Sequence, residues 1–445
     1  MKGKLLLIAL ASLASTWMMS CASDDGIANT NSIEDDKKLV IMVSDHEPIA
    51  LTASQRIFVK DNNKFTLNFL KTIHEASAKG KDFIYSPLSI TYVLGMVNDA
   101  AEGATRQELE QTLGFHEGGI QAVNEYCKKL IDGLPKVDEN VQLNIANTIF
   151  VNNRFTLKKN YQDDMQTYYD AKAEALDFSS PNTVNHINDW CNEKTQGMIP
   201  SIIETIDPDA VSYLLNAIYF KADWTSKFDP QNTKEEDFYS DNPEKVLHLC
   251  PMMHQNVLIR YMKNDVFSAV KIPYGNSKWN MTIFLPEEGK NTENVVNWLA
   301  ENGLPDIDNN LGIGETGIGE TREVDLKIPR YGSKSDTNDI EGGLIGLLKK
   351  MGIERVFDKE RAEIPNMCEG KGQLYIQMMR QKAAIEVNEK GSEAAAVTIG
   401  KVGYTAAVGQ EPTFEKAVFH ANRPFIYVIS ESSTNVILFV GKYSL

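Results

Sequence analysis

The stretch EVNEKGSEAAAVTIG, residues 386–400, carries the signals of two kinds of secondary structure. It begins with the alternation of a strand, is interrupted by Gly391, continues with alanines typical of a helix and ends in β-branched residues. In a strand, alternate side chains share a face. One face then carries only small, uncharged residues: Ser392, Ala394, Ala396, Thr398 and Gly400. Such a segment can enter the middle of a sheet without burying a charge.

The same letters also allow a short surface helix with Ser392 as its N-cap. The charged residues Glu393 and Lys401 share the other face of the strand, but a short helix exposes both as well. Propensity alone slightly favours the helix. This stretch therefore leaves both interpretations open, and the choice between them rests on the rest of the chain.

The bulk composition describes a globular, acidic protein. The chain has 445 residues, with 45 Lys and Arg against 61 Asp and Glu, a formal net charge of −16. That charge repels a phosphate backbone, so we expect no nucleic-acid partner. After about residue 51, helical and strand-like runs alternate without a Pro- or Gly-rich linker. This pattern predicts one mixed α/β domain with large sheets.

The N-terminus has the pattern of an export signal. Lys2 and Lys4 precede an apolar run, residues 5–19, that is short for a membrane span and ends just before Ser20 and Cys21. A small residue directly before a cysteine resembles a bacterial lipoprotein signal at residues 1–20, with Cys21 as the lipidated residue. A plain secretory signal is the alternative.

Residues 21–50 are polar and acidic, which predicts a flexible tether. We therefore expect an exported lipoprotein of the outer membrane or cell surface, whose lipid anchor is its only contact with the membrane. A secreted or periplasmic protein is the alternative.

Hydrophobic periodicity predicts the main elements. We predict helices at residues 65–77, 104–115, 161–176, 184–198, 293–303 and 339–352, and strands at residues 142–151, 211–224, 266–274, 279–286 and 323–331. Residues 425–430 and 436–443 flank a polar turn and are predicted to form a buried hairpin.

Several patterns resemble enzyme or metal sites without their context. Gly312, Gly314 and Gly317 have the spacing of a dinucleotide-binding motif, but a predicted helix precedes them and a strand follows, which predicts a loop instead. The seven histidines have no metal-binding spacing, and no G-x-S-x-G motif is present. We expect no catalytic residue, metal or cofactor. The scattered cysteines are predicted to be buried free thiols: Cys127, Cys191, Cys250 and Cys368.

Three longer motifs occur in the same order as in a known family. Residues 83–115, 216–228 and 419–429 resemble the N-terminal, central and C-terminal signatures of the serpins. The similarity extends over residues 51–445. It implies a mixed α/β fold with three β-sheets, about nine helices and an exposed reactive-centre loop at about residues 389–418. It also implies a metastable native state.

The resemblance also implies a function: irreversible inhibition of an endopeptidase by a suicide-substrate mechanism. The protease cuts the loop and forms an acyl-enzyme, and the cut loop then inserts into the central sheet. The resemblance places the hinge of the loop at Glu389, Gly391, Ser392, Ala394, Ala396 and Thr398, with Ser392 the first residue buried on insertion.

The residues that gate the central sheet are also implied by the resemblance. Trp224 falls where insertion begins, and Gln381 stands where many members have a histidine. Together with Gln381, Ser86, Ser89 and Asn216 form the part of this group called the shutter. The hinge contains no proline, bulky residue or inward-facing charge, which favours an inhibitor over a non-inhibitory binding or scaffolding serpin.

In the family, the cut bond usually lies sixteen positions after the hinge glutamate, which here gives Thr405–Ala406. The stretch that follows is longer than usual, so Lys401 and Tyr404 are alternative sites of cleavage. A small β-branched residue before the bond predicts an elastase-like serine protease as target; subtilisin-like and papain-like enzymes also accept such a residue. We expect a monomer that is not itself an enzyme.

Overall fold

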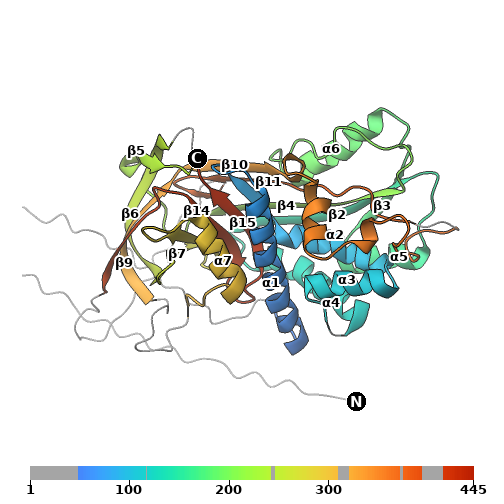
Figure 1. Cartoon of the computed structure of the whole chain (residues 1–445), viewed down its shortest axis with the longest axis horizontal. Helices are drawn as coiled ribbons and strands as arrows, with labels where there is room; N and C mark the ends of the chain where they lie inside the picture. The colour runs from blue at the N-terminus through green and yellow to red at the C-terminus, as the bar shows by residue number, and fades with distance from the viewer. Residues whose placement is uncertain (1–48, 117, 242–245, 309–319, 371–373, 393–413) are drawn as a thin grey trace, which may run out of the picture. The chain divides into compact units, whose positions relative to one another are not determined.

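The structure is a computed structural model, and it describes residues 49–116, 118–241, 246–308, 320–370, 374–392 and 414–445 (Figure 1). Within these ranges, the α-helices are α1 (Ala53–Ala76), α2 (Pro87–Ala100), α3 (Gly103–Leu113), α4 (Gly119–Gly133), α5 (Lys159–Tyr169), α6 (Asn182–Lys194), α7 (Thr292–Asn302) and α8 (Gly343–Lys350). The predicted signal sequence, Cys21 and all of the predicted tether except residues 49 and 50 lie outside the described residues. Ile49 is buried.

The strands of the described ranges form two hydrogen-bonded sheets. The six-stranded sheet has the order β10 (Tyr331–Asp336), β11 (Lys382–Val387), β12 (Gly391–Ser392), β4 (Ser212–Asp223), β2 (Val141–Asn152) and β3 (Lys172–Leu176). The nine-stranded sheet has the order β1 (Phe83–Tyr85), β15 (Ile437–Tyr443), β14 (Phe425–Glu431), β8 (Trp279–Pro286), β7 (Phe267–Tyr274), β6 (Leu247–Lys263), β9 (Glu320–Pro329) and β13 (Lys416–His420), with β5 (Lys234–Tyr239) paired to β6.

The long strand β6 explains why two sheets are present where the resemblance implied three. Residues 252–261 of β6 pair with β9, whereas only residues 260–263 pair with β7. One strand therefore passes from a smaller sheet (β5, β6, β9 and β13) into a larger one, and hydrogen bonding joins the two. The mixed α/β class is confirmed; the described ranges contain eight α-helices against the nine or so expected.

The main hydrophobic cluster contains residues of both sheets and of the helices, and a second, smaller cluster contains residues of α6, β2 and β4. Helix α2 is buried on nearly every side and contacts both β4 and β15, as expected for a helix with apolar residues all round. Figure 1 shows α6 on the other side of the six-stranded sheet. The C-terminal hairpin of β14 and β15 is confirmed, and each of its strand residues is buried.

One predicted helix is half wrong. Residues 161–176 were expected to be helical throughout, but α5 ends at Tyr169 and Asp170 takes a left-handed conformation with φ 48°. Residues 172–176 then form β3, which pairs in parallel with β2. Their alanines favour a helix locally, but the edge of β2 offers backbone partners, and this tertiary pairing overrides propensity.

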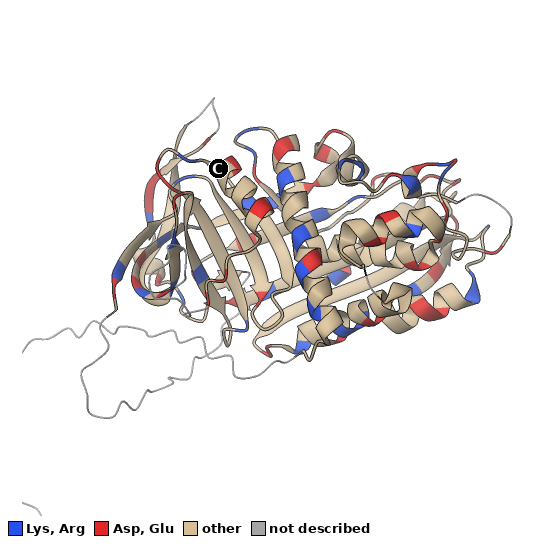
Figure 2. Ribbon diagram, turned by 60° about the horizontal axis from the view of Figure 1, so that its bottom comes forward, with Lys and Arg blue, Asp and Glu red and all other residues tan. Residues whose placement is uncertain are grey.

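The surface carries charges of both signs. Figure 2 shows Lys and Arg interspersed with Asp and Glu along the helices in view. The described part of the chain contains no helix with both the length and the apolar character needed to span a membrane. The glycine motif at residues 312–317 lies outside the described residues, and β9 begins shortly after it, at Glu320.

Candidate functional site

The short strand β12 lies between β11 and β4 at one end of the six-stranded sheet. Gly391 pairs with Asp223, and Ser392 pairs with Ala222 on one side and Val387 on the other. A Cβ atom on Gly391 would lie 2.0 Å from the carbonyl oxygen of Ala222, so only glycine allows this close approach. The first residues of the predicted hinge are therefore already part of the sheet.

Trp224 holds the turn that leads into β12. Its backbone N–H donates to the carbonyl oxygen of Lys390 (2.7 Å), and its indole N–H donates to that of Asn388 (2.9 Å). The indole ring stacks on Tyr274, with ring centroids 4.3 Å apart and an angle of 11° between the planes. The structure thus places Trp224 directly against the start of the hinge.

Ser392 differs from the expectation. We expected its side chain to become buried only when the loop inserts, but in the uncut chain it is 1% exposed. Its hydroxyl lies 2.8 Å from the hydroxyl of Tyr274, a hydrogen bond that satisfies both groups. Because β11 and β4 flank Ser392 at this point, any further burial on insertion begins after it.

Glu389 anchors the hinge through a buried carboxylate, 6% exposed. The Nε of Arg330 donates to both carboxylate oxygens (3.1 and 3.2 Å), and the hydroxyl of Thr233 donates to one of them (2.6 Å). Burial raises the pKa of Glu389, but the hydrogen bonds from Arg330 and Thr233 outweigh burial, so the pKa lies below its ordinary value.

Sequence reasoning missed these partners. Arg330 and Thr233 are 59 and 156 residues away from Glu389, and no motif links them to it. Tyr274 was likewise assigned only to a strand. Thr233 directly precedes β5, Arg330 lies between β9 and β10, and Tyr274 ends β7, so only the folded chain brings them to the hinge.

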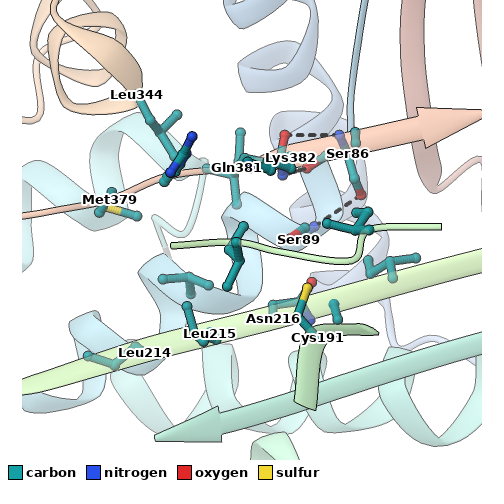
Figure 3. A pocket seen from close by; sticks show the side chains of 18 of the residues that line it. Ser86, Ser89, Cys191, Leu214, Leu215, Asn216, Leu344, Met379, Gln381 and Lys382 are labelled. Atoms are coloured by element: carbon teal, nitrogen blue, oxygen red, sulfur yellow. Dashed lines mark hydrogen bonds between the residues drawn. The ribbon is translucent and has the colours of Figure 1, made fainter. Parts of the chain in front are cut away.

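Beyond β12, the edge of β4 that faces β11 has no partner within the described ranges. Residues 212–221 of β4 pair only with β2, on the opposite edge. A cavity of about 60 Å³ lies at this gap (Figure 3). The predicted shutter residues Ser86, Ser89, Asn216 and Gln381 all line it, together with apolar side chains of β4 and α2.

Gln381 binds the backbone of Ser86 on one side of this cavity. The Nε2 of Gln381 donates to the carbonyl oxygen of Ser86 (2.8 Å), and the N–H of Ser86 donates to Oε1 of Gln381 (3.2 Å). The Ser86 hydroxyl donates to Leu438 and accepts from the N–H of Ser89, which caps α2. Gln381 therefore fixes the start of β11 to the helix below it.

Asn216 belongs to the other side of the cavity. Its Nδ2 donates to Oδ1 of Asn147 (2.8 Å), while its own Oδ1 is buried and has no hydrogen-bond partner among the described residues. The four shutter residues are thus close together, but the hydrogen bonds form two separate groups, one on α2 and β11 and one on β2 and β4.

Comparison with known proteins identifies the fold family. The family model described as Serpin (serine protease inhibitor) matches residues 60–444. The chain belongs to the serpin family. Serpin B11 of Homo sapiens is 30% identical to this serpin over 402 residues, covering 86% of this chain and 97% of the relative.

Two solved serpins have similar structures. Tengpin, a thermophilic serpin in its native state, matches with a TM-score of 0.74 and 25% identity over 92% of this chain and 97% of tengpin. Thyroxine-binding globulin in complex with thyroxine matches with a TM-score of 0.73 and 26% identity over 87% and 98% of the two chains. The same fold therefore occurs in this serpin and in a member that binds a small molecule.

Part of the expected loop of this serpin lies outside the described residues. This part contains the hinge positions Ala394, Ala396 and Thr398 and the candidate cleavage positions Lys401, Tyr404, Thr405 and Ala406.

The four described cysteines are buried and unpaired, as predicted. Burial raises the pKa of Cys127 to about 12 and that of Cys191, Cys250 and Cys368 to about 11, so these thiols are poor nucleophiles. Within the described ranges, no group of His, Cys, Asp and Glu is arranged to hold a metal ion.

Proposed function

We propose that this serpin is an irreversible, suicide-substrate inhibitor of serine endopeptidases with an elastase-like target. One observation carries the proposal: a strand is begun at β12, and the edge of β4 directly beyond it is unpaired in the described structure. A cut loop that continued β12 along this edge would pair with β4 on one side and with β11 on the other.

The chemistry is that of acyl transfer. The protease serine attacks the carbonyl of the residue before the cut bond, and the amine of the next residue leaves with a proton. The loop is then free at its new C-terminal end, which carries the protease as an ester. Insertion of the loop moves that ester away from the end of the sheet where the protease first bound.

The free energy available from insertion matches the task. About ten residues, opposite residues 212–221 of β4, would gain pairing. At roughly 0.5–1.5 kcal/mol per net hydrogen bond, they contribute on the order of 10 kcal/mol. Whole domains are stable by about 5–15 kcal/mol. Insertion can therefore compete with the free energy that keeps the active site of the protease ordered.

The target follows from the residue before the cut bond. Thr405 is small and β-branched, which suits the shallow pocket of an elastase-like enzyme; subtilisin-like and papain-like enzymes are further candidates. Cleavage after Lys401 or Tyr404 would instead indicate trypsin-like or chymotrypsin-like enzymes. We further propose that the serpin is a monomer, exported and tethered to the cell envelope through a lipid on Cys21.

Mixing the protein with elastase tests the proposal. We expect a covalent complex that survives denaturing gel electrophoresis, and mass spectrometry of the released C-terminal peptide locates the cut bond. Trypsin and chymotrypsin serve as comparison enzymes, and a panel in which only trypsin is blocked would contradict the elastase-like target.

Clean cleavage of the loop with elastase left active would instead support a non-inhibitory role. The structural similarity to thyroxine-binding globulin keeps this second candidate, a binding or scaffolding serpin, in view.

A further inference from the structure

Strand β13 is the anchor at the far end of the loop. It comprises Lys416–His420, directly after the residues that contain the proposed cut bond. Within the described ranges it is an edge strand that pairs only with β9, in parallel. Of its five residues only Phe419 is buried. Backbone pairing to a single strand therefore holds β13, together with the side chains that contact it.

One carboxylate joins β13 to two other strands. The Oδ1 of Asp325, on β9, lies 2.8 Å from Nε2 of His254, on β6. Its Oδ2 lies 3.1 Å from Nε2 of His420, the last residue of β13. The strand register places all three side chains on one face. His254 and His420 both pair with Lys327, and Asp325 lies two residues before Lys327 on the same face of β9. Asp325 thus contacts an imidazole on each neighbouring strand.

The other charged groups named on this face lie opposite partners other than Asp325. Lys327, next to Asp325 on the same face of β9, binds Glu236 of β5 at 2.8 Å. Lys416 of β13 stands opposite Glu323 of β9 in the register. Among the described groups near Asp325, only the two histidines are of a type that changes charge between pH 5 and 8.

We propose that His254, Asp325 and His420 are positioning residues that hold β13, and with it the C-terminal end of the loop, more firmly at pH 6 than at pH 8. A protonated imidazole adds an ionic attraction to its contact with Asp325. A neutral imidazole can retain the hydrogen bond at His254, whereas Nε2 of His420 has no hydrogen bond of suitable geometry among the described residues. The role of the loop rests on the proposed function, but the attachment of β13 does not.

The carboxylate remains charged over the relevant range. Burial raises the pKa of Asp325, but the contacts with His254 and His420 outweigh burial, so the pKa lies below its ordinary value. Its contribution is thus present above the ordinary pKa of an aspartate, about 3.9, and is lost only as the pH falls further.

Hydrogen exchange of residues 414–421 in the intact, uncut protein tests the proposal directly. After correction for the intrinsic pH dependence of exchange, we expect protection to fall about two- to tenfold between pH 6 and pH 8, the range for two partly exposed ion pairs. In the double variant His254→Gln and His420→Gln, the side chains can still donate a hydrogen bond but cannot become charged. Its protection should not change with pH.

The control is His186→Gln, because His186 of α6 contacts Glu174 at 3.0 Å, and Glu174 lies on β3 of the other sheet. This variant should retain the pH dependence. If the double variant does not fold, the single variant His420→Gln should show a reduced slope. An unchanged slope in the variants, or no slope in the wild type, would overturn the proposal. None of these measurements involves a protease, so their outcome does not depend on whether the proposed protease inhibition is correct.

Discussion

The two halves of the gap between β4 and β11 are built in different ways. At the hinge end, β12 is paired on both sides, and Glu389, Ser392 and the indole of Trp224 all have hydrogen-bond partners. At the shutter, the edge of β4 is unpaired within the described ranges and the Oδ1 of Asn216 is buried without a partner.

This difference shows where a strand is already formed and where it is missing. Forming the first pairs of a strand costs chain entropy, and each later pair costs less because the chain is already in place. Here the first pairs, at the hinge, are already formed in the uncut chain. The unsatisfied groups lie beyond it, at the shutter, so the free energy that insertion would release resides in the shutter half.

The largest expected effect comes from placing a charge on the inward face of the missing strand. Thr398 has the same parity as Ser392, whose side chain points to Tyr274 in the core. Thr398→Arg should abolish the covalent protease complex and turn the protein into a substrate, because burying an unpaired charge costs about 3 kcal/mol or more. The ratio of complex to cleaved protein on a denaturing gel measures this.

Val397→Arg is the matched control, because residue 397 faces the other side of the strand. It should still form the complex. Equal loss of complex in both variants would mean that the face of the sheet does not matter.

A smaller effect is expected at the hinge itself. Trp224→Phe keeps a ring against Tyr274 but leaves the carbonyl oxygen of Asn388 without its indole donor. We expect a loss of about 1–2 kcal/mol, seen as a lower urea midpoint. Trp190→Phe, on α6, is the control and should shift the midpoint less. A larger shift in the control would place the anchor of this region elsewhere.

The ion pair of the hinge gives a pH-dependent prediction. Because the pKa of Glu389 is lowered, the pair stabilises the protein above the ordinary pKa of a glutamate and this contribution is lost as the pH falls through the lowered value. Arg330 is half exposed, so Arg330→Met should cost only about 1 kcal/mol at pH 7. The difference from wild type in urea unfolding should shrink as the pH is lowered below the ordinary range of a glutamate, and a constant difference would exclude this pair as its source.

The smallest effect is expected across the shutter cavity. Gln381 and Asn216 belong to separate hydrogen-bonded groups, so Gln381→Ala and Asn216→Ala should be additive within about 0.5 kcal/mol in a double-mutant cycle on the uncut protein. The bonded pair Asn216 and Asn147 provides the control and should show coupling. Stronger coupling for the first pair would show that the two groups are joined.

Local patterns predicted the elements with a strong signal. The continuous apolar runs of β14 and β15 and the helical spacing of α6 and α7 gave the correct type of structure. The alanines of residues 172–176 misled the prediction because the deciding partner, β2, lies elsewhere in the chain. Local propensity does not contain such information.

The site shows the same limit. The resemblance singled out Glu389, Trp224 and the shutter residues, and the structure places them beside β12 and the gap between β4 and β11. Arg330, Thr233 and Tyr274 had no signal of their own. Ser392 is already buried because β12 extends far enough to place it between β4 and β11. That extent depends on pairing with strands far away in the sequence. Alternation of small residues describes which side chains a sheet can accept, and it does not say how many it has already accepted.

The central claim is that the uncut chain is metastable and that cleavage completes the six-stranded sheet. Thermal unfolding of the loop-cleaved protein beside the uncut protein tests it most directly. With on the order of 10 kcal/mol gained on insertion, we expect the cleaved protein to melt higher by about 10 °C or more. Equal melting temperatures for the two forms would contradict the account.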